Sequence, residues 1–370
     1  MAALPADLST VVIAGGFVVA FAFGAVAAKV NFCTMGALSD VVNIGHWGRV
    51  RMWMLAVAVA VIGTTALRLL GWVDVPKAVA LRPSMPALSL LVGGLLFGVG
   101  MTLSGGCVNK NLLRLGAGSL RSLVVLVFMG LASYMTLKGL FGQWRVAVLD
   151  PVRIDLAANG WPDQSLGSAA AQLLGMPAQQ ALVAASALVV VLLLVFVFKD
   201  RLFRSNTTQL LGGLALGLLV VCGWFVSGHL GYGENPETLE NVYFATNTRT
   251  VESLSFVAPV AYTLELLMLW TDKSLHLTFG IASVLGMVAG SAAHALAAGR
   301  FRWEGFGSLA DLRAQLVGAV LMGFGGVTAL GCTVGQGMTG LSTLAIGSFI
   351  AVAAIVAGCV GTLKWLAWKA

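Results

Sequence analysis

The sequence has little charge. Only 10% of its 370 residues are Asp, Glu, Lys or Arg, whereas a soluble domain carries about 25%. This shortage excludes a protein that is surrounded by water on all sides. The formal net charge is +7, but no basic face and no basic-aromatic motif accompanies it, so nucleic acid is not an expected partner.

Residues that hold metals, cofactors or disulfides are also scarce. The chain has five cysteines and four histidines, with no CxxC pair and no Cys/His group at metal spacing. We therefore expect no metal, no cofactor and no disulfide framework. A P-loop is absent, and no chain of carboxylates runs through the apolar segments, so the sequence reveals no energy source. The first ten residues contain Asp7 and lack a basic start, which argues against a cleaved signal peptide.

Apolar residues and glycine are abundant instead. Hydrophobic residues make up 58% of the chain, and 46 residues are glycine. A spanning helix needs about 20 mostly apolar residues, and glycine lets helices approach closely in a lipid bilayer. The sequence therefore predicts an all-α integral membrane protein. The nine predicted spanning helices cover residues 11–28, 52–72, 88–103, 120–140, 178–198, 210–225, 275–298, 316–330 and 344–367.

Three of the cysteines share one register with a glycine. Cys33, Cys107 and Cys332 each follow a glycine by nine positions. At each of them an apolar helix meets a polar break, which predicts a short helix and then a second long helix. The three glycines are Gly24, Gly98 and Gly323.

A fourth copy of this unit fits the chain without a cysteine. It begins at Gly212 and places Val226 at the cysteine position. Its short helix is predicted at residues 256–270, because that segment is too short to span a bilayer and carries Pro259 and Glu265. The whole chain, 1–370, is thus predicted to be one transmembrane domain. Its parts are a repeat half 1–141, an outer loop 142–177, a linking helix 178–199 and a repeat half 200–370.

The distribution of positive charge predicts the orientation. Lys and Arg gather in alternate connections, whereas the opposite connections, 150–163 and 234–252, are acidic or mixed. Positive connections mark the cytoplasmic side, which predicts an external N-terminus, a cytoplasmic C-terminus and two halves of inverted topology. Such halves place a substrate between broken helices near the midplane. The predicted shape is an hourglass whose two vestibules meet at the cysteine-bearing breaks.

The residues at the breaks suit an anion. A short helix that starts at a cysteine directs free N–H groups and a positive dipole end into the cavity, and neutral donors surround the thiols. No catalytic residue is predicted. Free cysteine is also a common packing residue, and this alternative applies above all to Cys222 and Cys359, which lie outside the register. The predicted substrate path consists of Cys33, Cys107, Cys332, Asn31, Thr34, Asn109, Lys110, Thr333 and Gln336.

Three motifs carry a resemblance to a known family. They are NFCTMGALSD at 31–40, the GGC that ends at Cys107 together with LRLGAGSL at 113–120, and LGCTVG at 330–335. Together they resemble the YeeE/YedE family. The resemblance implies a transporter of the bacterial inner membrane, not an enzyme, that takes up sulfur compounds, typically thiosulfate, along three cysteines. These cysteines correspond to Cys33, Cys107 and Cys332. It further implies a small cytoplasmic TusA-like sulfurtransferase as a possible partner.

Two alternatives stay open beside thiosulfate uptake. The first is transport of a selenium compound or another sulfur oxyanion, since some members of the family are linked to selenium. The second is a membrane sulfurtransferase that carries sulfur as a cysteine persulfide. A reactive cysteine needs a base or cation that stabilises its thiolate, but no histidine and no second cysteine stands close to the three in sequence. We therefore expect thiosulfate to cross intact.

Overall fold

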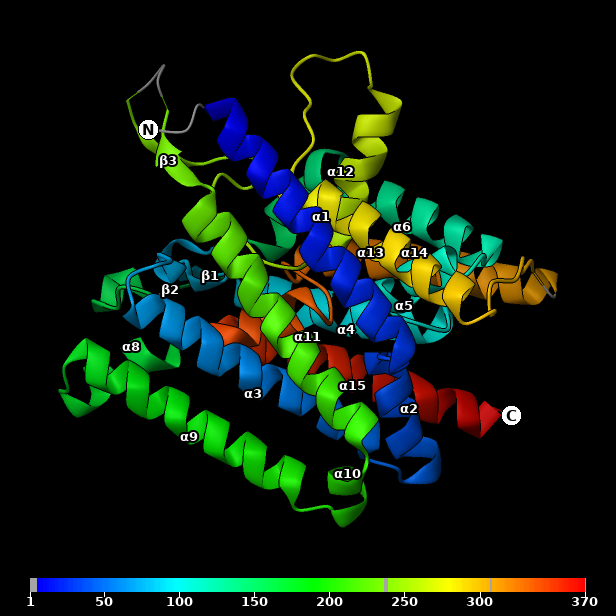
Figure 1. Cartoon of the computed structure of the whole chain (residues 1–370), viewed down its shortest axis with the longest axis horizontal. Helices are drawn as coiled ribbons and strands as arrows, with labels where there is room; N and C mark the ends of the chain where they lie inside the picture. The colour runs from blue at the N-terminus through cyan, green and yellow to red at the C-terminus, as the bar shows by residue number, and fades with distance from the viewer. Residues whose placement is uncertain (1–4, 236–238, 307, 370) are drawn as a thin grey trace.

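The computed structural model describes residues 5–235, 239–306 and 308–369. Long helices make up most of this part of the chain and cross one another in a bundle, and the short strands lie toward one end of it (Figure 1). Eight stretches of helix are long and apolar enough to cross a membrane. The all-α membrane fold class predicted from the sequence is therefore confirmed.

The first half consists of two units of the predicted kind. In each unit a long helix, a break, a short helix and a second long helix follow one another. The short helices begin directly after Cys33 and Cys107. The six helices are α1 (Pro5–Lys29), α2 (Thr34–Ile44), α3 (Gly48–Leu69), α4 (Ala87–Leu103), α5 (Val108–Gly116) and α6 (Leu120–Lys138).

Short elements and one long helix connect the two halves. The long helix is α9 (Ala178–Phe198), the predicted linking helix. Before it come α7 (Leu140–Trp144), the π-turn η3 (Arg145–Leu149), the 3-10 turn η4 (Ala157–Asn159) and α8 (Leu166–Leu174), and after it α10 (Arg201–Ser205). Strand β1 (Ser84–Met85) pairs antiparallel with β2 (Ile154–Asp155), which ties this connection to the 3-10 turns η1 (Val75–Lys77) and η2 (Val79–Leu81) ahead of α4.

The second half repeats the plan less regularly. Its elements are α11 (Thr207–Phe225), the π-turn η5 (Val226–Leu230), the antiparallel strands β3 (Tyr232–Glu234) and β4 (Asn241–Tyr243), α12 (Val257–Met268), α13 (Phe279–Ala297), α14 (Leu309–Thr328), the π-turn η6 (Gly335–Gly340) and α15 (Ile346–Lys369). The short helix predicted at 256–270 is α12.

The predicted break at Val226 is wrong. Val226 keeps helical dihedral angles, with φ −63° and ψ −50°, and α11 runs on through η5. The segment that leads into the short helix of this unit is 251–256 instead, and the β3–β4 hairpin is inserted before it. No pair of glycines like Gly105-Gly106 precedes Val226, so no local feature ends the helix there.

The sequence predicts nine spanning helices, and the described part of the chain has eight helical stretches apolar enough to span a membrane. Within the described ranges, the eight apolar stretches match eight of the nine predictions. The ninth, at 316–330, lies in α14, which has 20 residues but carries Asp311 and Arg313 near its start. These charges lower the hydropathy of α14, which is not among the eight apolar stretches, and the helix packs against α4 and α6.

Helices from the two halves pair reciprocally. The first long helix of each unit packs on the second long helix of a unit in the other half, so that α1 lies on α13 and α11 on α3. In the same way α4 lies on α15 and α14 on α6. This exchange relates the first unit to the third and the second to the fourth.

The shared glycines mark these helix crossings. A methyl group at Gly24 would lie 2.3 Å from the backbone oxygen of Met287 on α13. At Gly98 it would lie 2.3 Å from the oxygen of Ile355 on α15, and at Gly323 2.4 Å from that of Met129 on α6. Only glycine admits such backbone contacts. The nine-residue spacing therefore sets each cysteine at a fixed height above a crossing.

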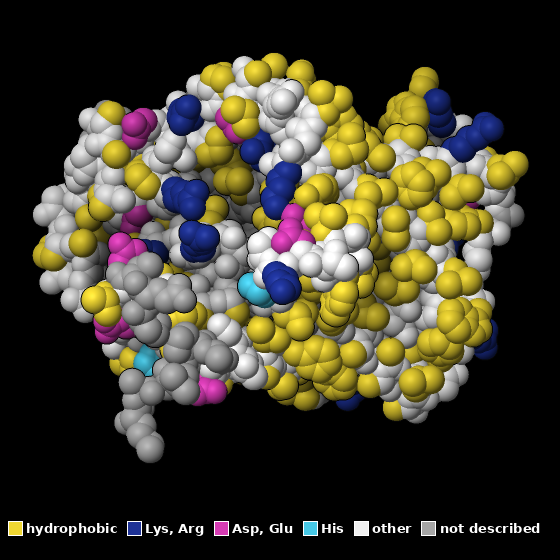
Figure 2. All heavy atoms as spheres, turned by 90° about the horizontal axis from the view of Figure 1, so that it is seen from above, with side chains coloured by type: hydrophobic (Ala, Val, Ile, Leu, Met, Phe, Trp, Pro, Cys, Tyr) yellow, Lys and Arg dark blue, Asp and Glu magenta, His cyan; other side chains and the backbone are white. Residues whose placement is uncertain are grey.

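The surface suits a lipid environment. Figure 2 shows one face of the molecule, on which Lys and Arg side chains gather around a hollow while hydrophobic side chains cover a broad area beside them. On α9, Leu188, Leu192 and Val195 are exposed by 62%, 61% and 63%. Exposed apolar side chains on so apolar a helix are what a bilayer covers.

Candidate functional site

Two backbone features place Cys33 at the start of α2. Asn31 adopts the left-handed conformation, with φ 53°, and turns the chain after α1. Cys33 itself is extended, with φ −158°, and its Sγ accepts a hydrogen bond from the Gly36 N–H at 3.3 Å. The thiol thus caps one of the free N–H groups that every helix start leaves unpaired.

Cys107 and Cys332 are positioned by comparable breaks. Gly105 ends α4 with φ 68°, a conformation that favours glycine, and Cys107 caps α5 in an extended conformation. After α14, Leu330 has φ 57°. The Sγ of Cys332 accepts from the Gly335 N–H at 3.3 Å, so the first and fourth units hold their cysteines in the same way.

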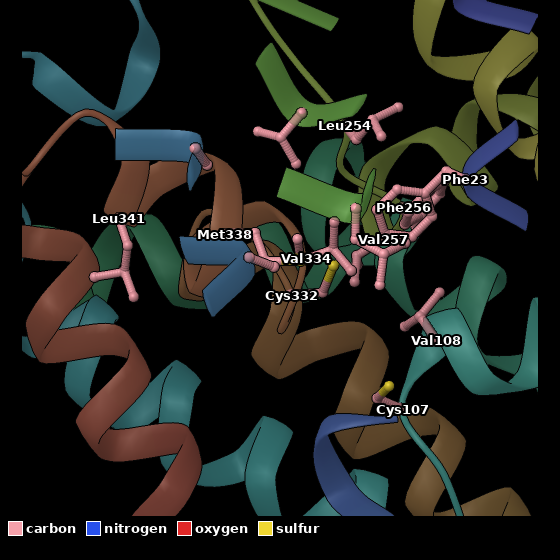
Figure 3. Packing of buried hydrophobic residues seen from close by; sticks show 14 of the residues in the cluster. Phe23, Cys107, Val108, Leu254, Phe256, Val257, Cys332, Val334, Met338 and Leu341 are labelled. Carbon is pink, nitrogen blue, oxygen red and sulfur yellow. The ribbon is translucent and has the colours of Figure 1, made fainter. Parts of the chain in front are cut away.

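The three cysteines of the register lie in the same part of the interior. The thiol of Cys33 lies against that of Cys107, and Cys107 lies beside Thr333, the residue next to Cys332. Cys33 is 5% exposed, and the other two are fully buried. Figure 3 shows Cys107 and Cys332 in the same part of the interior, with Phe256 and Val257 near Cys332. We call Cys33, Cys107 and Cys332 the cysteine cluster.

A cavity approaches the cluster from the side of α12. It has a volume of about 230 Å³, and we call it the α12 cavity. Its wall includes Gly331 and Gly335, which flank Cys332, and Ser255 from the segment that precedes α12. Its remaining wall is partly apolar, with Trp224 and Phe279.

A second cavity reaches the cluster from the short helices of the first half. It has a volume of about 310 Å³, and Cys33 itself forms part of its wall. Arg49, Lys110 and Arg114 line it together with a single carboxylate, Asp40. Asp40 pairs with Arg49 at 3.3 Å. We call it the basic cavity, because the excess of cations favours an anion there.

Several polar atoms beside the cluster have no partner. Within the described ranges, Thr34 Oγ1, Asn109 Oδ1 and Thr333 Oγ1 are buried without a hydrogen bond. Asn109 uses its amide nitrogen to donate to the Phe32 oxygen at 3.4 Å. A buried polar atom without a partner costs about 1–3 kcal/mol, so a polar ligand that supplied the missing bonds would be stabilised.

Two of the predicted path residues also brace the breaks. Lys110 Nζ donates to Asn31 Oδ1 at 2.5 Å and so links α5 to the turn after α1. Gln336 lines the α12 cavity, but its amide is engaged: it donates to the Ala329 oxygen at 2.8 Å and accepts from Ser348 Oγ at 2.6 Å. Its carboxamide therefore holds the break after α14 in shape.

The remaining cysteines lie elsewhere. Cys222 is exposed on α11. Cys359 is buried on α15, where the Thr102 hydroxyl of α4 donates to its sulfur at 3.3 Å. Both side chains belong to helix surfaces and not to a break.

Sequence reasoning missed some residues and one contact. It passed over Arg49 and Arg114 in the basic cavity, although Arg114 belongs to the LRLGAGSL motif, and over Glu252 in the α12 cavity. No second cysteine stands close to the three in sequence, but the fold brings Cys107 beside Cys33 and so provides the neighbouring thiol that the sequence did not indicate. No local signal indicates this contact.

Helices broken at buried polar residues beside cavities are typical of multi-pass membrane transporters. A family described as sulphur transport matches residues 29–361. The chain belongs to this family, which confirms its resemblance to YeeE/YedE proteins.

Two characterised relatives match over nearly their whole length. The thiosulfate transporter TsuA of Spirochaeta thermophila is 25% identical over 359 residues, which is 96% of this chain and 98% of the relative. The thiosulfate transporter TsuA of Escherichia coli is 23% identical over 375 residues, which is 96% of this chain and 95% of the relative. Family and relatives together support transport of a sulfur compound.

Proposed function

We propose that this protein takes up thiosulfate intact through the cysteine cluster. The observation that carries the proposal is that Cys33 lines the basic cavity, while Gly331 and Gly335, on either side of Cys332, line the α12 cavity. An anion that passes from one cavity to the other meets sulfur, backbone N–H groups and unpartnered polar atoms, and no carboxylate at the cluster itself.

The chemistry of the cluster suits a sulfur oxyanion. A dianion loses water when it enters a narrow interior, and this loss is costly unless donors replace the water. Thiols are weak S–H donors, and the short helices α2 and α5 add free N–H groups. Weak donors at successive sites hold the anion without trapping it, which a passage requires.

One observation favours a second candidate, a membrane sulfurtransferase. The contact between Cys33 and Cys107 supplies the neighbouring thiol that a persulfide mechanism uses. In that mechanism a cysteine thiolate would attack the outer sulfur of thiosulfate, form an S–S bond and release sulfite. The neighbouring thiol would then take over the sulfur.

Thiosulfate labelled differently on its two sulfur atoms separates the two candidates. In proteoliposomes that contain this protein, both labels are expected inside in equal amounts. Mass spectrometry of Cys33, Cys107 and Cys332 after turnover is expected to show no added sulfur. Internal accumulation of the outer sulfur alone, or a persulfide at any of the three, would identify a sulfurtransferase. Competition with unlabelled selenite, sulfite and sulfate in the same assay ranks the other candidate substrates.

We further propose an orientation in the bacterial inner membrane. The N-terminus is external, the C-terminus is cytoplasmic, and the basic cavity opens to the cytoplasm, where a TusA-like sulfurtransferase could receive the product. The positive-inside rule supports this arrangement, since Arg49, Lys110 and Arg114 all line the basic cavity.

Reporter fusions test this orientation. A reporter fused to the C-terminus at Ala370, which lies outside the described residues, is expected to be cytoplasmic. A reporter inserted between the exposed residues Leu239 and Glu240, in the β3–β4 connection, is expected to be external. The stretch 231–241 in which this insertion falls also includes residues outside the described ranges. The same side for both reporters would refute the three crossings, by α13, α14 and α15, that the proposal places between the two sites.

A further inference from the structure

The α12 cavity contains a carboxylate that a passage for anions does not explain. Glu252 lies on the segment that leads into α12 and lines the cavity together with Asn247, Thr248 and Tyr262. Its backbone is anchored to Ser227 of η5. The Ser227 hydroxyl donates to the backbone carbonyl oxygen of Glu252 and accepts from the backbone N–H of Glu252 at 3.2 Å. The side chain is therefore held at the cavity wall.

No cation neutralises this carboxylate. Within the described part of the chain, Glu252 forms no ion pair, and its carboxylate accepts only two long hydrogen bonds. The Asn247 N–H donates at 3.4 Å and the Thr248 hydroxyl at 3.4 Å. A half-buried charge with so few partners is costly, and protonation removes that cost.

The other charged groups around the cavity are engaged elsewhere or are exposed. Arg145 of η3 lines the same cavity, but it pairs with Asp150 at 3.4 Å. Lys138 of α6 pairs with Glu265 of α12 at 2.6 Å. Tyr262 of α12 also lines the cavity, and Arg249, on the same segment as Glu252, is exposed.

Burial has a direct electrostatic consequence. It raises the pKa of Glu252 to about 7, because the charged form loses water, and the bonds from Asn247 and Thr248 oppose this shift only in part. At neutral pH the group therefore exchanges readily between a carboxylate, which repels an arriving dianion, and a carboxylic acid, which can donate a hydrogen bond to it.

We propose that Glu252 is a proton-binding site that admits the anion: a dianion occupies the α12 cavity together with a proton on the Glu252 carboxylate. The proton comes from the same side as the anion, and no covalent bond other than O–H forms. This inference rests on the proposed function, since it takes thiosulfate as the dianion.

The proposal sets the direction and size of a pH effect. Glu252 is protonated below its pKa, so anion binding is strong at low pH and weakens as pH rises. If only the protonated form accepts the anion, the competent fraction falls from about nine-tenths at pH 6 to about one-tenth at pH 8, and the apparent affinity falls about tenfold.

Initial uptake rates in proteoliposomes test this effect. With labelled thiosulfate at equal pH on both sides, the KM of the unaltered protein is expected to rise about tenfold between pH 6 and pH 8. Glu252→Gln mimics the protonated state and is expected to keep a low KM across this range. Glu240→Gln, at an exposed glutamate of the same connection, is the matched control and should behave like the unaltered protein.

Two results would overturn the proposal. One is a KM of the unaltered protein that does not change with pH, and the other is a Glu252→Gln variant that keeps the full pH dependence. If the unaltered protein takes up no thiosulfate at any pH, the proposed function itself fails.

An infrared titration tests whether Glu252 binds a proton, and it does not depend on a transport measurement. The C=O band of a protonated carboxyl group is expected to titrate near neutral pH in the unaltered protein and in Glu240→Gln, and to be missing in Glu252→Gln. A band that persists in Glu252→Gln, or its absence from the unaltered protein, would refute the assignment. Glu252→Asp, which retains a carboxyl group, covers the case in which the glutamine variant does not fold.

Discussion

Alanine at Cys33, Cys107 or Cys332 is expected to reduce thiosulfate uptake by about tenfold or more, with the abundance of the protein in the membrane unchanged. Each substitution removes a hydrogen-bond donor from a buried site, and such a loss costs about 1–3 kcal/mol. Cys107 should show the largest loss, since its thiol is fully buried and lies against that of Cys33. The measurement is the initial uptake of labelled thiosulfate by whole cells, normalised to the amount of protein in the membrane.

Cys222 and Cys359 provide the matched controls. Cys222→Ala changes an exposed side chain on α11. Cys359→Ala removes an acceptor of the Thr102 hydroxyl, but that hydroxyl keeps its bond to the Gly98 oxygen at 2.9 Å. Both variants should retain most of the uptake. Equal losses at all five positions would show that the register has no functional meaning.

Serine at Cys107 distinguishes the role of sulfur from that of a small donor. Cys107→Ser keeps a hydroxyl donor in nearly the same place and should transport better than Cys107→Ala. A serine variant as inactive as the alanine variant would indicate that thiol chemistry itself is required, and would favour the sulfurtransferase candidate.

Alanine at Gly290 is expected to destabilise the protein more than alanine at any exposed glycine. A methyl group there would lie 1.9 Å from the backbone oxygen of Phe21, and a backbone oxygen cannot move aside as a side chain can. Helices α1 and α13 must separate, and overpacking of this kind costs about 1–3 kcal/mol or more. The measurement is the Tm in detergent together with the yield of folded protein.

Gly361 on α15 is the control for this prediction. A methyl group at Gly361 would contact nothing within 4 Å. Gly361→Ala is therefore expected to leave the Tm unchanged or to raise it slightly, because alanine favours a helix by about 1 kcal/mol over glycine. Equal effects of the two substitutions would contradict the close α1–α13 crossing.

The cysteine register shows how far sequence reasoning reached. The nine-residue spacing from Gly24 to Cys33 recurs after Gly98 and Gly323. In each unit the glycine allows close contact with the backbone of a neighbouring helix, and the cysteine stands at the break that follows the long helix. Both features are local to a unit, so the sequence displays them. The same reasoning misplaced the break of the third unit at Val226, since the β3–β4 hairpin inserted there has no counterpart in the other units.

By itself, the sequence determined the membrane environment, the helices and the short helices at the cysteines, because apolar windows, glycine spacing and polar breaks act within a few turns of chain. Only the tertiary structure decided that Cys33 meets Cys107, that three cations surround a single carboxylate in the basic cavity, and that Glu252 stands unpaired in the α12 cavity. These features join residues from separate units. Their distances depend on how helices of the two halves cross, and no pattern within a single segment records that.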